Sequence, residues 1–121
     1  MFDAVNALSE GGTENYRIES FDGSRLVLIG SFDLDYYHDI ELIFSEVALI
    51  NCPVYFNQPR FSEVASKEEG RCFQIATEEG VFEIVADDVS IMMGKVYHYD
   101  RGDQLLPGER IAECVKKDER P

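Results

Sequence analysis

Apolar and polar positions alternate through most of the middle of the chain, a pattern that predicts short β-strands. Residues 16–21 alternate loosely, and residues 25–29 form an aliphatic run just after Asp22-Gly23. Glycine adopts a positive φ without penalty and aspartate tolerates it, so this dipeptide between two such runs predicts a β-hairpin.

Further strand-like runs follow, separated by acidic or glycine-containing turns. We expect strands at 40–44 and 47–50 around a turn at Ser45-Glu46, and at 72–76, 81–86, 89–93 and 96–99 around turns at 78–80 and 87–88. Gly94, which lies between the runs 89–93 and 96–99, predicts a bulge or bend in this part of the chain. The segment 54–70 is irregular, and we expect a long loop with at most one helical turn.

Both ends of the chain have helical spacing. Phe2, Val5 and Leu8 recur every three residues, and Asp3 is expected to cap a short helix there. Residues 109–117 begin with acids and end with lysines, as the helix dipole prefers, which favours a short amphipathic helix. A final strand of similar length is the alternative for that segment.

About six to eight short strands joined mostly by tight turns imply antiparallel pairing, because parallel strands need crossovers of a dozen or more residues. We therefore predict a mainly β (α+β) protein, with an antiparallel sheet folded as a sandwich or partial barrel and one or two short terminal helices. No repeat or linker divides the sequence, so residues 1–121 are expected to form a single domain.

The composition adds a strong acidic bias to this fold. The chain has 121 residues, with 24 Asp and Glu against 11 Lys and Arg, and a formal charge of −13. A surface of phosphates would repel it, so we expect neither nucleic acid nor an anionic membrane as a partner. No apolar run approaches the ~20 residues needed to span a bilayer, and the N-terminus lacks the pattern of a signal peptide.

Cysteine usage points to a reducing compartment. Cys52, Cys72 and Cys114 are odd in number and widely spaced, which does not fit a disulfide framework. We therefore expect a cytoplasmic protein with reduced thiols. Cys52 or Cys72 could act as a nucleophile beside a histidine base. However, positions 72 and 114 follow the apolar pattern, where cysteine usually behaves as a small buried hydrophobe, so we predict no catalytic residue among the thiols.

The two histidines occur in related contexts, Tyr-His-Asp at 37–39 and Tyr-His-Tyr-Asp at 97–100. If their strands were neighbours, His38 and His98 could share a metal or form an acid–base pair. Otherwise they are ordinary strand residues beside aromatics and acids. Sequence alone does not give their separation, and we predict no metal and no cofactor. Arg-Gly-Asp at 101–103 is interpreted as a turn.

The most distinctive feature is a long stretch without basic residues. Between Arg25 and Arg60 there is no Lys or Arg, while the same window holds five acids and six of the 14 aromatic residues. Tyrosines supply large amphipathic contact area, and the acids would steer a cationic partner. We predict a partner-binding site there, formed by Asp33, Asp35, Tyr36, Tyr37, His38 and Asp39.

Residues 40–47 (IELIFSEV) and 82–91 (FEIVADDVSI) resemble the strand–turn–strand segments of small, acidic, β-rich bacterial proteins of uncharacterised families. Several such families look like immunity proteins, the cognate inhibitors of toxins deployed between bacterial cells. The resemblance implies a cytoplasmic protein that works by binding another protein, and it carries no functional residue with it.

These observations favour a non-enzymatic acidic module that binds a basic protein, as an inhibitor of the immunity type. The alternative is a small-ligand-binding β-domain with an aromatic-lined pocket, in which residues 54–70 form a lid. An unpaired strand at the edge of an open sheet could also form a homodimer.

Overall fold

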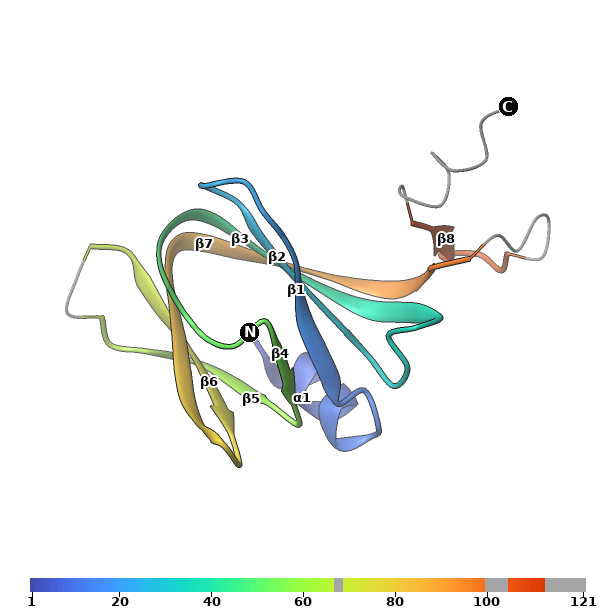
Figure 1. Cartoon of the computed structure of the whole chain (residues 1–121), viewed down its shortest axis with the longest axis horizontal. Coiled ribbons are helices and arrows are strands. Elements are labelled where there is room, and N and C mark those ends of the chain that lie inside the picture. The colour runs from blue at the N-terminus through green and yellow to red at the C-terminus, as the bar shows by residue number, and fades with distance from the viewer. Residues whose placement is uncertain (67–68, 100–104, 113–121) are drawn as a thin grey trace.

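A strongly curled antiparallel sheet forms the body of the molecule in the computed structural model, which describes residues 1–66, 69–99 and 105–112 (Figure 1). The predicted mainly β, antiparallel fold is confirmed. Within the described residues lie one helix and eight strands: α1 (Asp3–Glu10), β1 (Asn15–Phe21), β2 (Leu26–Ser31), β3 (Tyr37–Asn51), β4 (Tyr55–Asn57), β5 (Arg60–Val64), β6 (Arg71–Thr77), β7 (Gly80–Tyr97) and β8 (Arg110–Ile111).

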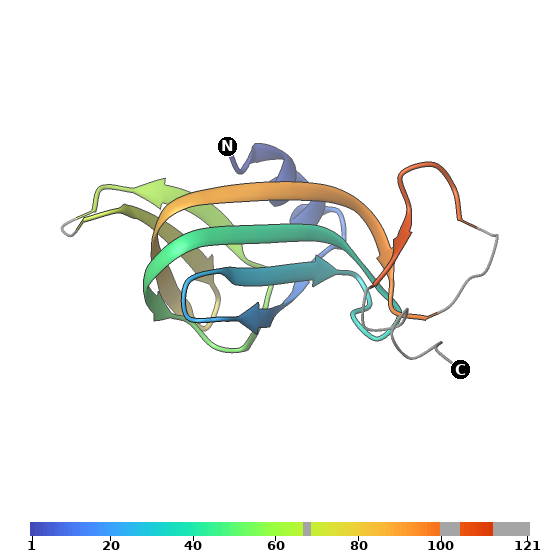
Figure 2. The same ribbon diagram turned by 90° about the horizontal axis from the view of Figure 1, so that it is seen from above.

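The strand order in the sheet is β4-β1-β2-β3-β7-β6-β5, and β8 pairs in parallel with the end of β7. The two longest strands, β3 and β7, lie at its centre and pair along nearly their whole length, from Tyr37 opposite Tyr97 to Asn51 opposite Glu83. Figure 2 shows β1, β2, β3 and β7 side by side, with both long strands bending through the curl. One half of each long strand therefore belongs to each half of the curled sheet.

Strands β3 and β7 continue through both places where a polar pair of residues predicted a turn. Strand β3 continues through Ser45-Glu46, where Glu46 adopts a left-handed φ of 52° and the register with β7 shifts between Val47 and Leu49. The predicted turns at 45–46 and 87–88 were therefore wrong, because these positions kink or continue paired strands. The bulge predicted at Gly94 is confirmed, since its φ is 136° and the pairing shifts between His38 and Ile40.

Two predicted turns have the expected local chemistry. Between β1 and β2, Gly23 has a φ of 98°, and the Asp22 carboxylate accepts the backbone N–H groups of Arg25 and Ser24. These hydrogen bonds, with that from Arg25 first, lower the pKa of Asp22. The turn between β6 and β7 follows Thr77, whose hydroxyl oxygen accepts the N–H of Glu79.

Three local predictions need correction. The segment 54–70 contains β4 and β5, because Phe56 and Phe61 are buried and draw this stretch into the sheet. Helix α1 forms as predicted, but Phe2 occupies the N-cap and no side chain caps the helix, so Asp3 does not. Residues 110–111 form the short strand β8, as the alternative for this segment predicted, and residues 109 and 112 are not helical; residues 113–117 of the predicted helix lie outside the described residues.

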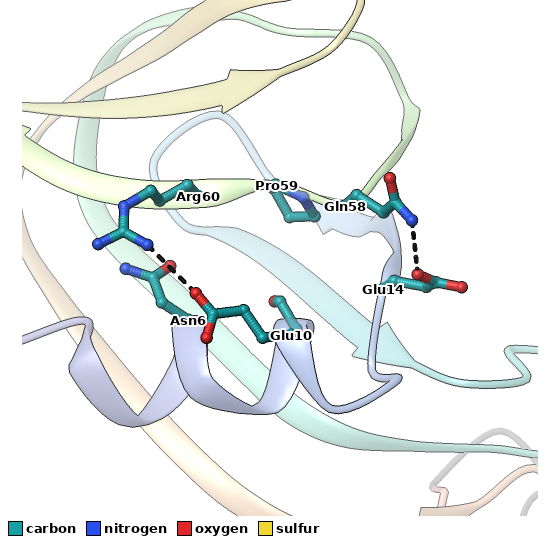
Figure 3. A pocket seen from close by; sticks show the side chains of 7 residues that line it. Asn6, Glu10, Glu14, Gln58, Pro59 and Arg60 are labelled. Atoms are coloured by element: carbon teal, nitrogen blue, oxygen red, sulfur yellow. Dashed lines mark hydrogen bonds and ion pairs between the residues drawn. The ribbon is translucent and has the colours of Figure 1, made fainter.

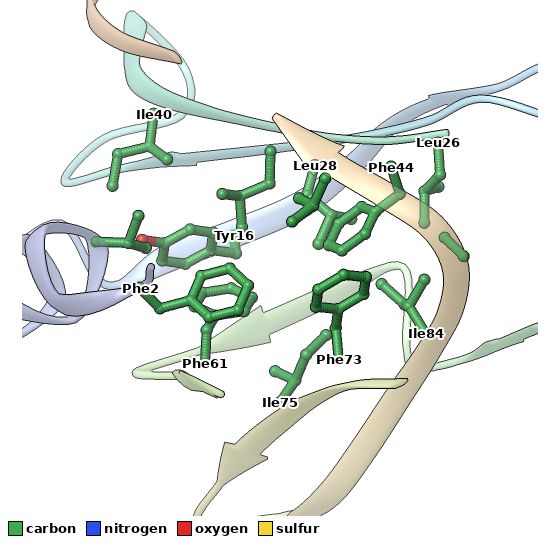
Figure 4. Packing of buried hydrophobic residues seen from close by; sticks show 14 of the residues in the cluster. Phe2, Tyr16, Leu26, Leu28, Ile40, Phe44, Phe61, Phe73, Ile75 and Ile84 are labelled. Atoms are coloured by element: carbon green, nitrogen blue, oxygen red, sulfur yellow. The ribbon is translucent and has the colours of Figure 1, made fainter. Parts of the chain in front are cut away.

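The main hydrophobic core fills the inside of the curl. Buried side chains from α1 and from β1, β2, β3, β5, β6 and β7 meet there, and the rings of Phe44 and Phe73 lie 5.4 Å apart at its centre (Figure 4). The Tyr16 ring stacks on Phe56 and lies over Gly30, where an added Cβ would come within 2.3 Å of the ring. Glycine at position 30 therefore lets an aromatic ring pack directly on the backbone of β2.

A smaller cluster lies on the opposite face of the sheet. Alternation along β2 turns Leu26 and Leu28 into the main core and Val27 and Ile29 to the other side. There Val27 and Ile29 pack with Leu34, which belongs to the loop between β2 and β3. This cluster anchors that loop on the sheet.

Helix α1 closes the open side of the curl by a hydrogen-bonded clamp. The Asn6 carboxamide donates to the backbone oxygen of Phe61 at 3.0 Å and accepts the N–H of the same residue at 2.8 Å. It satisfies the two groups that a neighbouring strand would otherwise pair, on the outer edge of β5.

We expect Asn6→Ala to lower the free energy of unfolding by about 1–3 kcal/mol, because the N–H and C=O of part-buried Phe61 lose both partners. Urea unfolding followed by circular dichroism measures the change. Asn51→Ala, at an exposed strand end, is the matched control and is expected to change the free energy by less than about 0.5 kcal/mol. Equal effects from both substitutions would contradict the clamp.

Phe44→Ala is expected to cost about 3–5 kcal/mol, because it removes a fully buried ring from the centre of the core. Phe32→Ala, which removes the same atoms from an exposed ring, should change stability by less than about 0.5 kcal/mol. Thermal and urea unfolding of the two variants would compare them directly. A small loss for Phe44→Ala would mean that the curled sheet does not enclose the core as described.

Candidate functional site

The predicted partner-binding residues begin in the loop 32–36, between β2 and β3. This loop is built by an Asp turn: the carboxylate of Asp33 accepts the N–H of Asp35, and its backbone oxygen accepts that of Tyr36. Phe32 and Tyr36 remain 65% and 59% exposed, and Asp35 is exposed as well. The turn thus presents aromatic and acidic side chains to solvent from a rigid base.

A shallow hollow of about 240 Å³ lies beside this loop. Its lining comes from the loop, β1 and β4: Asn15, Arg17, Phe32, Asp33, Leu34, Asp35 and Tyr55. Asn15 holds the parts together, since its amide donates to the backbone oxygen of Phe32 and its side-chain oxygen accepts the Tyr55 hydroxyl. We call Phe32, Asp33, Asp35, Tyr36 and Tyr55 the docking surface.

Tyr37, His38 and Asp39 lie apart from this surface, at the start of β3. Tyr37 is half-buried, with its ring 6.5 Å from that of Tyr97 and the Lys95 ammonium 5.2 Å from its centre. His38 is only 5% exposed, and Asp39 is half-buried. The structure therefore brings Asp33, Asp35 and Tyr36 together at the surface and places the other three predicted residues in contacts within the protein.

His38 and His98 meet directly, which answers the question that sequence left open. His38 Nδ1 lies 2.7 Å from His98 Nε2, His38 Nε2 lies 2.9 Å from a Glu41 carboxylate oxygen, and His98 Nδ1 lies 2.8 Å from the backbone oxygen of Leu34. In a regular strand, residues three apart face opposite sides. These two side chains nevertheless meet, next to the place where the register of β3 with β7 shifts between His38 and Ile40.

Burial and hydrogen bonding shift the acidity of these groups. The hydrogen bond from His38 lowers the pKa of Glu41. Burial lowers the pKa of His98, and the nearby charge of His38 lowers it further. Both shifts favour a carboxylate at Glu41 and resist a charge on His98.

The geometry of the pair fits a hydrogen bond better than a shared metal. Two nitrogens that bind one tetrahedral Zn²⁺ at ~2.0–2.1 Å each are separated by about 3.4 Å, well beyond the observed 2.7 Å. All four ring nitrogens contact a protein group. Among residues 1–66, 69–99 and 105–112, no group of three or more His, Cys, Asp and Glu side chains is arranged to hold a metal ion.

Asp39 belongs to a polar cluster between α1 and the sheet. One carboxylate oxygen accepts the Thr13 hydroxyl at 3.2 Å, and the other is buried without a hydrogen-bond partner. Burial raises the pKa of Asp39. Nearby, the Tyr16 hydroxyl hydrogen-bonds with that of Ser9, and burial raises the pKa of Tyr16 to about 12.

The described thiols lie in settings that suppress reactivity. Cys52 and Cys72 are not joined in a disulfide; Cys52 is half-buried, and burial raises the pKa of its thiol. Cys72 is buried next to the core residue Phe73 in β6 but outside the core cluster, and its thiol lies 3.6 Å from a Glu83 carboxylate oxygen. Cys114 and the 101–103 tripeptide lie outside the described residues.

A second hollow, of about 280 Å³, lies between α1 and the turn that joins β4 to β5 (Figure 3). Its walls are mostly polar, and ion-paired or hydrogen-bonded side chains cross its sides: Arg60 contacts Glu10 at 3.4 Å and Gln58 contacts Glu14 at 2.9 Å. Its lining includes no Phe or Tyr among the described residues, so it differs from the aromatic-lined pocket that a small-ligand function predicts.

Searches against family models, curated proteins and solved structures give no match to this chain. The resemblance to immunity proteins therefore stays a prediction. In the part of the chain that the structure describes, no helix is long and apolar enough to cross a membrane.

Two groups of residues in the candidate site were not predicted from the sequence. Phe32 and Tyr55 lie in the window without basic residues, but Tyr55 reaches the docking surface only because residues 55–57 pair with β1. Glu41 contacts His38 next to the irregular pairing of β3 with β7, and the carbonyl of Leu34, in the loop 32–36, contacts His98. For these partners, the spacing along the chain gives no signal.

Asp39→Asn is expected to raise the free energy of unfolding at pH 7.5. A folded-state pKa above the unfolded value favours the protonated form, so the stability that this group contributes is lost as pH rises. The neutral amide removes that loss, and the gain over wild type should shrink near pH 4. Urea midpoints at both pH values measure it, with Asp35→Asn, exposed and equal in charge change, as the control. Lower stability of Asp39→Asn at pH 7.5 would contradict this account.

Proposed function

We propose that this chain is a non-enzymatic module that binds a basic protein through the docking surface. The observation that supports this most directly is the combination of exposed aromatic rings with carboxylates around one hollow. Phe32 and Tyr55 line this hollow together with Asp33 and Asp35, and Tyr36 follows Asp35 in the loop 32–36. All three rings are more than half exposed. Large exposed rings beside charges of one sign are typical of a partner contact rather than of a plain solvated loop.

Charge complementarity supports a cationic partner. Arg17, the basic residue in the lining, is ion-paired with Glu19 at 3.3 Å, so its charge is partly compensated. The carboxylates of Asp33 and Asp35 are not paired with a basic side chain among the described residues. The formal charge of −13 adds a long-range attraction that raises the association rate with a basic surface.

The hollow suggests how such a partner is held. A lysine or arginine side chain that enters it would contact the faces of Phe32 and Tyr55 and approach the two carboxylates at the rim. Cation–π contacts with exposed rings contribute about 0.5–1 kcal/mol each, and charge-assisted hydrogen bonds add to this. The partner would bind by a few such anchors, with Tyr36 covering the edge.

An inhibitor of the immunity type is the specific form of this function that we propose. Such a protein acts by occlusion: it covers a basic site of its partner and needs no reactive group of its own. Enzymatic use of the histidines is less well supported, because neither ring has a nitrogen that lacks a protein contact. The small-ligand alternative is also less well supported, since the aromatic hollow, at about 240 Å³, lies below the usual ~300–1,000 Å³ range.

The test uses a synthetic peptide in which arginine alternates with tyrosine and leucine, titrated into ¹⁵N-labelled protein. We expect amide shifts confined to residues 32–36 and 55, lost as salt is raised to 0.5 M because exposed charges are then screened. Asp35→Lys should weaken binding on the order of tenfold, because like charges then meet in the complex.

Glu79→Lys, an equal charge reversal in the exposed β6–β7 turn, is the matched control and should leave the affinity within about twofold, since that turn is remote from the docking surface. A peptide with glutamate in place of arginine should not bind. Equal losses from both reversals, or shifts spread over the whole acidic surface, would show non-specific attraction and reject the docking surface.

A further inference from the structure

We propose that His38 and His98 share a single proton and act as a pH-sensitive latch on the loop 32–36. The latch itself is defined by contacts within this chain. Its consequence for partner binding rests on the proposed function, because the latched loop carries most of the docking surface.

The proton count follows from the acceptors at the two ends of the pair. The Leu34 carbonyl and the Glu41 carboxylate only accept, so His98 Nδ1 and His38 Nε2 must each donate an N–H. The remaining two nitrogens face each other at 2.7 Å. Without a further proton both present lone pairs, and with two further protons both are donors. One proton between them satisfies all three hydrogen bonds, and the two rings then carry one positive charge.

Both departures from this state break a contact. If the pair loses its extra proton, two N–H groups must serve three acceptors, and one hydrogen bond opens. If it gains another proton, both facing nitrogens carry an N–H, and the 2.7 Å between these nitrogens has room for only one hydrogen atom. The closed arrangement therefore exists in a window of pH, bounded on both sides.

His98 transmits this state to the loop at two points. Its backbone N–H donates to the oxygen of Tyr36 at 2.8 Å, and its ring donates to the oxygen of Leu34 at 2.8 Å. Leu34 is also buried against Val27 and Ile29 in the cluster on the outer face. The latch thus fixes the two residues that flank exposed Asp35.

Charged groups from the surrounding elements set the acidic boundary. Glu41 of β3 faces His38 and also accepts from Arg110 of β8 at 3.4 Å, while Arg17 of β1 opposes and Glu19 of β1 favours a charge on His98. Around His38, Asp39 of β3 adds a negative charge that Lys95 of β7 partly balances.

Burial is the main reason that the pKa of His98 is lowered. The lowered pKa disfavours a further proton on His98, so on acidification the unfolded chain takes up that proton more readily than the folded chain. The stability that depends on keeping this proton off His98 is present above a pH of about 6.5 and is lost as pH falls through the folded-state pKa. Acidification should open the pair and release the loop before it unfolds the sheet.

The test measures imidazole ¹⁵N and ¹H resonances of the full chain between pH 4.5 and 8.5. At pH 7 we expect three N–H protons on the two rings, one of them shifted far downfield as in a short hydrogen bond. On acidification the amides of residues 34–36 should shift with the same midpoint as His98, with protection from exchange reduced ~tenfold. The amides of the Asp22–Arg25 turn are the internal control and should stay unchanged over this range.

His98→Gln provides a second readout, because a carboxamide can hydrogen-bond but does not titrate; its loop amides should lose their pH dependence above pH 5. Independent titration of the two histidines, unchanged loop amides on acidification, or saturable binding of one equivalent of Zn²⁺ between the rings would each overturn the latch. None of these measurements includes a partner, so failure of the cationic peptide to bind would reject the docking function alone.

Discussion

The pairing of β3 with β7 is the interaction on which the rest of the structure depends. These two strands are the only described ones long enough to run through both halves of the curl, and the ladder between them continues from Tyr37–Tyr97 to Asn51–Glu83. The middle of the ladder carries the core residue Phe44, one end carries Ile84, and the histidine pair lies at the other end. A shift of register by one residue would exchange the inner and outer faces along this whole ladder. Core and candidate site are therefore specified together.

One irregularity in that ladder, between His38 and Ile40, lies where the titratable side chains of β3 meet their partners. Beside this shift, with Gly94 at a positive φ on the partner strand, His38 contacts Glu41 and Asp39 contacts Thr13. A regular strand would separate His38 from Glu41 by placing them on opposite faces. The acidic, aromatic segment is thus divided into an exposed loop, residues 32–36, and a set of buried or half-buried titratable groups at the start of β3. The two sets are joined through the carbonyl of Leu34.

Sequence patterns predicted the fold class well, but they did not predict that β3 and β7 would each run as one long strand. Alternation gave the antiparallel class, and Asp22-Gly23 and Gly94 were interpreted with the correct local chemistry. The polar pairs Ser45-Glu46 and Asp87-Asp88 predict turns because such pairs usually end strands, but in the structure β3 and β7 pair continuously through them. At the candidate site, composition predicted Asp33, Asp35 and Tyr36, which the structure places together in one surface loop. It could not separate them from His38, whose burial depends on a partner that is 60 residues away in the chain.

The clamp of Asn6 on Phe61 also sets an order of events for this chain. The helix that covers the outer edge of β5 is synthesised before that strand. The Asn6 side chain must therefore stay unpaired until Phe61, 55 residues further along the chain, has been synthesised. Until the clamp closes, β5 offers unsatisfied backbone groups to any extended segment nearby, including those of other nascent copies. Loss or delay of this N-terminal helix would therefore expose a template for aggregation.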